Sequence, residues 1–206
     1  MSDLFCPATV IVVRHAETEY DAPGIASDSG GSLSLTGREQ ARQLGSSLAS
    51  RRVAAIWCSD MARAVQTAEI AAAVLGVTVR VRPGLREFGV GGLAGQPITA
   101  LDEVFASWVG GDLAGGCPGA ETGQDVVTRV SKELESIADQ YRGETVLAVS
   151  HGGAMGVVLP WLAGNVPADF AVGKPTDNCG TCELEADADG WVMKTWNGQQ
   201  LAAYVD

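Results

Sequence analysis

The chain has 206 residues and a formal net charge of -11, with 14 Lys and Arg against 25 Asp and Glu. That length suits one domain, with room for an inserted segment. Hydrophobic residues make up 46% of the chain, which indicates a globular protein and not a disordered one. The negative charge argues against a nucleic-acid partner, whose phosphates it would repel, but allows a small phosphorylated molecule in a local basic pocket.

The first ten residues, MSDLFCPATV, have neither a basic start nor a long apolar core. We therefore expect no signal peptide, no membrane span and a cytoplasmic location. The chain has five cysteines, and we expect reduced thiols, because an odd number without an export signal does not indicate disulfides. Cys179 and Cys182 form a lone CxxC pair. Both histidines lie elsewhere in the sequence, so we predict no metal site and no cofactor.

The N-terminal part contains three predicted strands, the third of them at residues 78–81. Residues 10–13 are apolar and β-branched, as in a buried strand, and Arg14 and His15 follow directly. In α/β folds, ligands bind just beyond the carboxyl ends of strands, so this pair is a candidate for a binding site. Residues 22–35 are rich in Gly, Ser and Asp and predict a loop, and residues 53–57 predict the second strand.

Two helices are predicted around the second strand. Thr36 and Glu39 have the spacing of a capping box, so we expect the first helix to begin at Thr36. The second helix is expected to begin at residues 59–60 and to end before Gly76, which places Arg63 about one turn into it. The apolar stripe of the first helix comprises Ala41, Leu44, Leu48 and Ala49.

The segment 83–121 differs in composition from the rest of the chain. It is rich in glycine and contains one short predicted helix, at residues 98–108. The apolar face of that helix comprises Leu101, Val104, Phe105 and Trp108. Long connections of this kind commonly cover functional sites. We therefore expect one domain comprising residues 1–206, with residues 83–121 inserted as a lid.

The C-terminal part continues the alternation of strands and helices. Its predicted elements are a helix at 121–141, a strand at 146–149 and a hairpin of strands at 179–186 and 191–196. His151 follows the strand at 146–149, and Gly152 opens another helix, whose backbone N–H groups can face an anion. The alternation predicts an α/β fold with a mainly parallel sheet, to which the hairpin adds antiparallel edge strands.

The chain has only two histidines, His15 and His151, and each follows a predicted strand. They are either unrelated structural residues or parts of one site. Arg14 and Arg63 lie just past strand ends as well. Guanidinium groups bind phosphate oxygens through paired hydrogen bonds, to which an imidazole and the Gly152 N–H group add donors. A neutral imidazole is also a competent nucleophile, so a shared site would suit metal-free phosphoryl transfer through a phosphohistidine.

Four sequence motifs, RHAET, SDMARAVQTAE, LREFGVGGLAG and SHGGAM, occur in this order. Together they resemble the histidine phosphatase superfamily, which is related to the phosphoglycerate mutases, from about residue 9 to residue 164. The resemblance implies a three-layer α/β/α sandwich. It also implies that His15 accepts the phosphoryl group and that Glu87 protonates the leaving group. The residues it places around the phosphate are Arg14, Arg63 and His151.

Glu87 has to be protonated when it donates its proton, and packing against Phe88 and the lid would raise its pKa. In the second half-reaction its carboxylate would activate water. The chain departs from the family pattern at two positions: Ala16 stands where glycine is usual, and Asp21 stands where asparagine is often found. A carboxylate close to a phosphate would repel it, so we do not assign Asp21 a phosphate contact.

Basic residues are missing from both segments expected to cover the site. No Lys or Arg occurs between Phe88 and Thr128 or between Glu17 and Thr36. A phosphoglycerate mutase has to hold a carboxylate and a second phosphate, which requires cations. We therefore predict a phosphatase for a small phosphorylated substrate whose remainder is neutral or cationic. The candidate contacts to that remainder are Thr18, Tyr20, Phe88, Phe105 and Trp108.

Two alternatives to a phosphatase stay open. One is a phosphoglycerate mutase-type phosphotransferase, and the other is a non-catalytic module that binds phosphorylated ligands. The presence of every candidate catalytic residue favours an enzyme over a binding module. A lid would also hinder a folded protein as substrate. We expect neither a nucleic-acid nor a membrane partner, and the sequence sets no oligomeric state.

Overall fold

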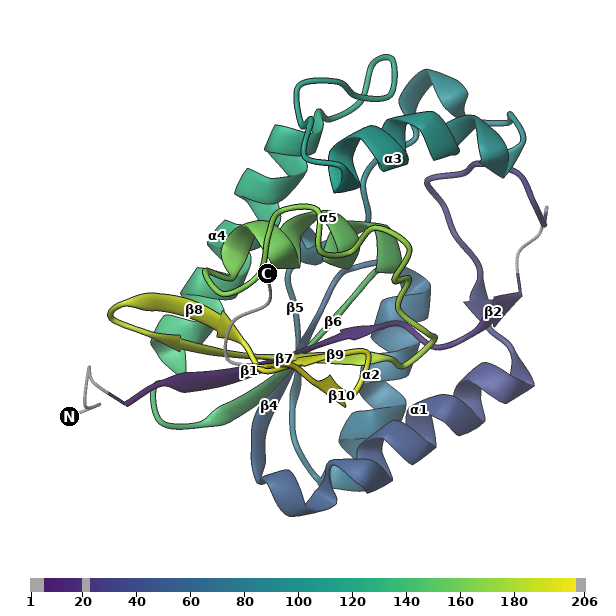
Figure 1. Ribbon diagram of the computed structural model, residues 1–206. Helices are drawn as coiled ribbons and strands as arrows, with labels where there is room; N and C mark the ends of the chain where they lie inside the picture. Colours follow the sequence, from purple (N-terminus) through teal and green to yellow (C-terminus); the bar gives the residue numbers. More distant parts are fainter. Residues whose placement is uncertain (1–5, 20–22, 203–206) are drawn as a thin grey trace.

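The computed structural model describes residues 6–19 and 23–202. Its largest sheet has six strands in the order β5-β4-β6-β1-β7-β8 (Figure 1). The parallel strands are β1 (Ala8–Arg14), β4 (Val53–Cys58), β5 (Val79–Val81) and β6 (Thr145–Ser150). β7 (Thr181–Asp187) and β8 (Gly190–Met193) form a hairpin that pairs antiparallel with β1. The predicted parallel sheet and its C-terminal antiparallel hairpin are both confirmed.

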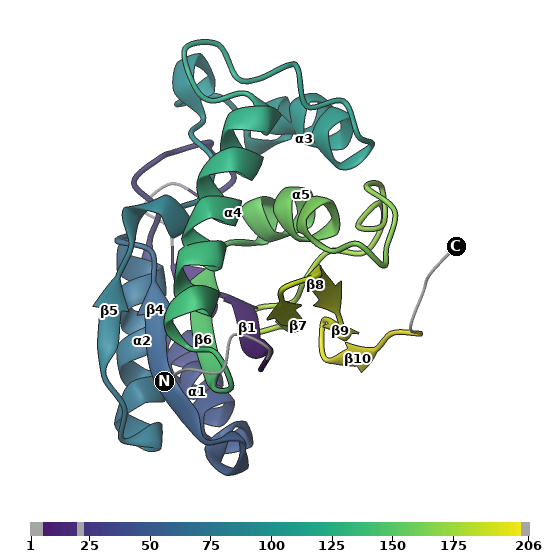
Figure 2. The same ribbon diagram turned by 90° about the vertical axis from the view of Figure 1, so that its left-hand side faces the viewer.

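Helices cover both faces of this sheet and make three layers (Figure 2). α1 (Leu35–Ser47) and α2 (Ala62–Leu75) lie on one face, and α4 (Gly123–Gln140) and α5 (Gly152–Leu162) lie on the other. Successive side chains of β1 point to opposite faces, so Ile11 packs in the α1 and α2 core whereas Val12 packs in the α4 and α5 core. A strand buried on both faces requires the continuous apolar run that the sequence has. No helix in the described part of the chain is long and apolar enough to cross a membrane.

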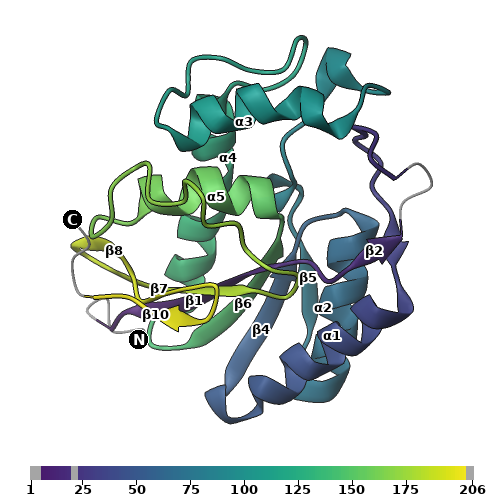
Figure 3. The same cartoon turned by 45° about the vertical axis from the view of Figure 1, so that its right-hand side comes forward.

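Residues 83–121 begin beside α4 and β6, and their helix at 102–109 lies over α5 (Figure 3). They contain three 3-10 helices, Pro83–Leu85, Gly91–Leu93 and Ile98–Leu101, and the helix α3 (Asp102–Val109). The helix predicted at 98–108 is therefore present, with a first turn of 3-10 type. Its Trp108 packs edge-on against Phe88, with 5.0 Å between ring centroids, and its indole donates to the carbonyl of Gly115 at 2.8 Å. Both contacts lie within residues 83–121 and stabilise the fold of this segment.

The predicted start of α1 was wrong. Ser34 is the N-cap, because its hydroxyl accepts a hydrogen bond from the Gly37 N–H group at 2.9 Å. Thr36 therefore lies inside the helix, and Glu39 pairs with Arg42 on the surface instead of closing a capping box. Ser and Thr are both good N-caps, and two of them stand close together here, so the local sequence does not decide between them.

Two further predictions around the first and second strands need correction. α2 begins at Ala62, and the expected residues 59–60 precede it. Asp60 does not occupy the first helical turn; it accepts a hydrogen bond from Arg86 at 3.3 Å. The segment 22–35 is not all loop, because β3 (Ser32–Leu33) pairs with β2 (Thr18–Glu19) in a short antiparallel ladder.

Candidate active site

The neighbouring strands β1 and β6 bring the two histidines together. Arg14 pairs with Ser150 across these parallel strands, and the His15 N–H group donates to the Ser150 carbonyl at 3.0 Å. Both strands end at the same edge of the sheet, so the residues that follow them lie side by side. The ring centroids of His15 and His151 are 5.2 Å apart.

β4 lies on the far side of β6 and delivers Arg63. The Ser59 N–H group donates to the Val149 carbonyl at 3.1 Å, which keeps the end of β4 level with the end of β6. Arg63 is the second residue of α2, and it is only 5% exposed. Gly30 packs directly on it, because a methyl group at Gly30 would overlap Nη1 of the guanidinium. A cation at a helix N-terminus is repelled by the partial positive charge of the helix. An anion bound beside Arg63 and the N-terminus of α2 would be attracted by both, so this position suits an anion.

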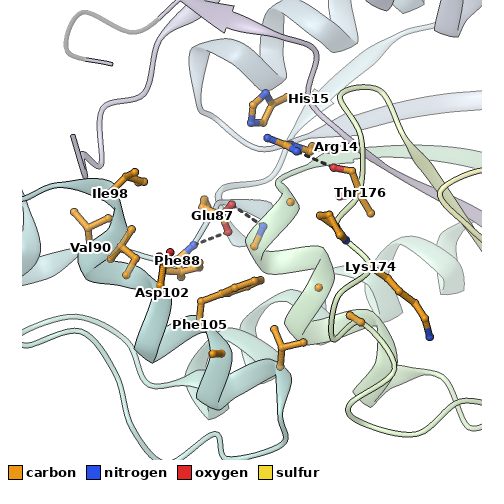
Figure 4. A pocket seen from close by; sticks show the side chains of 18 of the residues that line it. Arg14, His15, Glu87, Phe88, Val90, Ile98, Asp102, Phe105, Lys174 and Thr176 are labelled. Carbon is orange, nitrogen blue, oxygen red and sulfur yellow. Dashed lines mark hydrogen bonds between the residues drawn. The ribbon is translucent and has the colours of Figure 1, made fainter. Parts of the chain in front are cut away.

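A cavity of about 640 Å³ opens at this edge of the sheet, with Arg14, His15, Arg63 and Glu87 on its wall. Figure 4 shows Arg14, His15 and Glu87 together at one end of it. His151 is fully buried and does not line the cavity, whereas the next residue, Gly152, does.

The imidazole of His15 is held in one tautomer. Its Nδ1 lies 2.8 Å from the carbonyl oxygen of Ala16, and because a carbonyl can only accept, Nδ1 carries the proton. Nε2 then keeps a free lone pair. Burial lowers the pKa of His15 to about 3, and the charges of Arg63 and Arg14 act in the same direction against the Ala16 hydrogen bond. Ala16 is itself fixed, since its N–H group donates to the Thr67 hydroxyl at 3.0 Å.

Ser59 holds the second imidazole. Its hydroxyl lies 2.8 Å from Nε2 of His151, and both residues are fully buried. Nδ1 of His151 has no hydrogen-bond partner among the described residues. Burial, followed by the positive charge of Arg63, holds the pKa of His151 well below its usual value, so this ring is neutral as well. Ser59 was not predicted as a site residue, although it lies two residues beyond the predicted strand 53–57.

Glu87 reaches the cavity from the segment 83–121. The Ser150 hydroxyl donates to the Leu85 carbonyl at 2.9 Å, which ties this segment to the end of β6. The Glu87 carboxylate accepts hydrogen bonds from the backbone N–H groups of Gly153 at 3.0 Å and Ala154 at 2.6 Å, at the N-terminus of α5. Burial raises the pKa of Glu87, while these two hydrogen bonds and Arg63 oppose the rise. Burial is the larger effect, so the pKa of Glu87 is raised and its protonated form is favoured.

The loop between α5 and β7 completes the polar end of the cavity. Arg14 donates through Nη1 to the Thr176 carbonyl at 2.7 Å. The Nε atom of Arg14 and the hydroxyl of Thr176 are buried without a hydrogen-bond partner among the described residues. Asn178 donates to the His15 carbonyl at 3.1 Å. Sequence reasoning missed both loop residues, because nothing in the local pattern indicates that this loop folds back over β1.

The predicted substrate contacts fall into three groups. Phe88 and Phe105 line the cavity and are stacked on each other, with 6.2 Å between centroids and 16° between planes. Trp108 is fully buried behind Phe88 and Thr18 lies in β2, and neither lines the cavity, which corrects the expectation that they contact substrate. Tyr20, like Asp21, lies outside the described residues.

Lys174 is a basic residue of the cavity wall that the sequence analysis did not anticipate. Lys174 lies outside residues 17–36 and 88–128, the two segments without Lys or Arg that were expected to cover the site. Its ammonium nitrogen lies 3.8 Å from the ring centroid of Phe170, and in Figure 4 it points away from His15.

The comparison with protein families gives a match over residues 10–199 to the histidine phosphatase superfamily, branch 1. The chain belongs to this superfamily. The resemblance carried by the four sequence motifs is thereby confirmed, and superfamily membership supports a phosphatase or mutase activity.

Relatives and solved structures of the superfamily carry both kinds of name. The protein named "Probable phosphoglycerate mutase GpmB" from Salmonella choleraesuis (strain SC-B67) is 32% identical over 192 residues, which cover 91% of this chain and 89% of that protein. A mycobacterial glucosyl-3-phosphoglycerate phosphatase has the same fold, with a TM-score of 0.79, 23% identity and coverage of 94% of this chain and 100% of that one. A phosphoserine phosphatase from Entamoeba histolytica superposes with a TM-score of 0.73 at 19% identity, covering 93% of this chain and 97% of that one.

Proposed function

We propose that the protein is a metal-independent phosphomonoesterase that acts on a small phosphorylated metabolite through a phosphohistidine. The observation that carries this proposal is the state of His15. Its Nδ1 proton is committed to the Ala16 carbonyl, its pKa is lowered to about 3, and it lies on the wall of the cavity. A neutral imidazole with a free Nε2 lone pair is a nucleophile at any physiological pH.

The surrounding groups suit the charge of a phosphoryl group. Arg14 and Arg63 supply two guanidinium groups, and charge stabilisation is most of what phosphoryl transfer requires. The Gly152 N–H group at the start of α5 is a further donor. Ser59 holds Nε2 of His151 behind the cavity wall, so the Nδ1 atom of that ring would reach a phosphate oxygen only if the wall opened.

The proposed reaction has two steps. Nε2 of His15 attacks phosphorus, the bond from phosphorus to the ester oxygen breaks, and protonated Glu87 gives its proton to the departing alcohol. The Glu87 carboxylate then takes a proton from water, whose oxygen attacks the phosphohistidine and releases inorganic phosphate and neutral His15. A carboxyl group whose burial and hydrogen bonds pull its pKa in opposite directions is suited to change protonation state between the two steps.

We further propose that the chain is one domain in which residues 83–121 act as a lid. Glu87 and Phe105 both belong to this segment and both line the cavity. The same segment would therefore cover the site and provide the general acid, Glu87. A lid that excludes water also strengthens the electrostatic interactions inside.

The charges of the cavity favour hydrolysis over mutase chemistry. Apart from Arg14 and Arg63, Lys174 is the only Lys or Arg that lines the cavity within the described residues, and its ammonium group lies against Phe170. A mutase has to bind a substrate carboxylate and a second phosphate as well. We therefore assign a substrate whose part beyond the phosphate is neutral or cationic.

Hydrolysis of p-nitrophenyl phosphate tests the proposal. The wild-type protein should release phosphate, and His15→Ala should lower kcat/KM at least about a thousand-fold, because the nucleophile is lost. Leu35→Ala, at a side chain that is 84% exposed, is the matched control and should leave the rate unchanged. Denatured wild-type protein sampled during turnover should carry an acid-labile phosphoryl group that the His15→Ala protein lacks.

Two results would overturn the proposal. Conversion of 3-phosphoglycerate to 2-phosphoglycerate faster than its hydrolysis would assign the protein to the mutases. Equal inertness of wild type and His15→Ala toward phosphate esters, with binding of a phosphopeptide by both, would assign it as a binding module.

A further inference from the structure

The part of the cavity beyond the phosphate end is apolar. The 640 Å³ volume falls within the range of sites for drug-sized ligands, so a phosphate group fills only part of it. The segments 24–27, 88–109 and 171–176 meet there, although they lie far apart in the sequence. The apolar side chains that they contribute include Ile25, Val90, Ile98, Phe105 and Val172.

Three of these side chains are exposed at the mouth of the cavity. Ile25 is 38% exposed, Ile98 is 48% exposed and Val172 is 56% exposed, and each comes from a different segment. Single exposed apolar residues are common on protein surfaces, but a set that converges on one opening marks a binding surface. A ligand that extends from the phosphate end to the mouth would cover all three.

Hydrogen-bonding side chains are few in this part of the wall, and most are already engaged. The Ser27 hydroxyl bonds to Ser29 at 2.7 Å. The Trp196 indole donates to the Lys174 carbonyl at 3.0 Å, and the Lys174 ammonium group lies over Phe170. Asp102 and, toward the phosphate end, the Thr176 hydroxyl are the remaining ones, so a ligand with several hydroxyl groups would still leave most of them without a side-chain partner.

One wall is shaped for a flat or ring-bearing group. Helix α5 turns Gly152, Gly153 and Gly156 toward the cavity. Of the stacked pair, Phe88 lies against Gly153 and Phe105 lies against Gly156, whereas Arg14 lies against Gly152. A methyl group at Gly156 would stand 3.3 Å from Phe105 Cζ, which shows how closely the ring approaches the helix. The result is a smooth aromatic surface beside the phosphate end.

We infer that the substrate is a phosphate monoester of a largely apolar alcohol about the size of a substituted ring, and not a phosphorylated sugar or hydroxy acid. This inference rests on the proposed function and narrows its substrate class. The phosphate binds at Arg14 and Arg63, and the apolar part lies between Phe105 and Val172.

Cyclohexylmethyl phosphate and glucose 6-phosphate make a matched pair for the test. Both are esters of a primary alcohol carried on a six-membered ring, and they differ in the ring oxygen and hydroxyl groups. The wild-type protein should hydrolyse cyclohexylmethyl phosphate with a kcat/KM at least about ten-fold higher, because the ring is buried against apolar surface. Equal values, or a preference for glucose 6-phosphate, would overturn the inference.

A pair of variants locates the effect. Val172→Asn should lower kcat/KM for cyclohexylmethyl phosphate by about three-fold or more and change that for glucose 6-phosphate far less. Val81→Asn is the control, because Val81 is 50% exposed on β5 and does not line the cavity. An unchanged preference in Val172→Asn, or an equal change in Val81→Asn, counts against the inference.

Hydrolysis of p-nitrophenyl phosphate distinguishes an error in the substrate class from an error in the proposed function. If the wild-type protein hydrolyses it but does not prefer cyclohexylmethyl phosphate to glucose 6-phosphate, the substrate class is wrong and the proposed function stands. If all three esters are left intact, the proposed function itself fails.

Discussion

The two ends of the cavity are built in different ways. At the phosphate end, Arg14, His15 and Arg63 lie within a few residues of the carboxyl ends of β1 and β4, whose register is fixed by backbone hydrogen bonds to β6. At the mouth, Ile25, Ile98 and Val172 stand on three connecting segments with little regular structure.

This difference in construction suggests that the phosphate end of the cavity determines reactivity and that the mouth determines selectivity among substrates. The backbone of a residue at a strand end is held in place by the sheet. This suits chemistry that depends on the placement of reacting groups to within about 1 Å. A side chain on a connecting segment can be exchanged at little cost to the fold, which suits selectivity among alcohols. Variants at the two ends should therefore differ in kind. At the phosphate end they slow every ester, whereas at the mouth they change the preference between esters.

Among variants that keep His15, Glu87→Gln should give the largest effect, because it removes the proton donor and keeps the shape. For cyclohexylmethyl phosphate, whose alkoxide leaves poorly, kcat/KM should fall by about 10²–10⁴-fold. For p-nitrophenyl phosphate, whose phenolate leaves without a proton, the fall should be much smaller. Steady-state kinetics with both esters measures the difference. A similar loss with both would show that Glu87 positions the site and does not protonate the leaving group.

Gly153→Ala should act where the two ends of the cavity meet. The added methyl group would lie 2.5 Å from Phe88 Cε1 and 2.8 Å from Glu87 Oε1, so both side chains have to shift. A displacement of about 1 Å can cost up to a hundred-fold in rate, and we expect about ten- to a hundred-fold in kcat/KM for cyclohexylmethyl phosphate. The temperature of thermal unfolding should fall, since the higher helix propensity of alanine offsets only part of the cost of displacing the buried Phe88.

Gly164→Ala is the control for this substitution. Gly164 is exposed just beyond α5, and the nearest atom to an added methyl group there is the Trp191 carbonyl oxygen at 3.8 Å. Its kinetics should match the wild type. If Gly153→Ala is as active as Gly164→Ala, the placement of Glu87 by the start of α5 is not required for the reaction.

The phosphate end could be predicted from the sequence for a physical reason. Apolar runs that end at Arg14 and at Ser150 mark strands, and parallel strands end at the same edge of a sheet. The local sequence alone therefore predicts that His15 and His151 lie close together. In the structure the centroids of their rings are 5.2 Å apart. The local sequence does not predict the burial of His151, which lies behind the wall of the cavity and does not line it.

The mouth could not be predicted, because the positions of connecting segments depend on contacts between distant residues. Trp108 was expected to contact substrate on the strength of its ring alone, whereas the structure buries it behind Phe88. Val172 and Thr176 carried no local signal, since the loop that holds them is placed by bonds such as that from Arg14 to the Thr176 carbonyl. The same applies to Lys174, which changes the charge of the cavity wall.

The last prediction concerns the free energy of unfolding, and it again distinguishes the phosphate end of the cavity from its mouth. The pKa of His15 is about 3 in the folded protein and about 6.5 in the unfolded chain, so the unfolded chain binds the additional proton between these values. Acid therefore favours unfolding through this group. As the pH falls from 6.5 toward 3, the unfolding free energy of the wild type should decrease relative to that of His15→Gln by up to about 1.4 kcal/mol per pH unit.

Urea unfolding at pH 7, 6, 5 and 4 measures this difference. Glu87 acts in the opposite direction, since its pKa is raised by burial, but it is present in both proteins and largely cancels. His151 also remains in both and keeps its own dependence on acid. Val172→Asn provides the comparison from the mouth: neither valine nor asparagine titrates, so its difference from the wild type should not vary with pH. A constant difference for His15→Gln as well would mean that His15 has the same pKa in the folded protein as in the unfolded chain, so that its imidazole is mostly protonated at acidic pH. It would then be no nucleophile at pH 5.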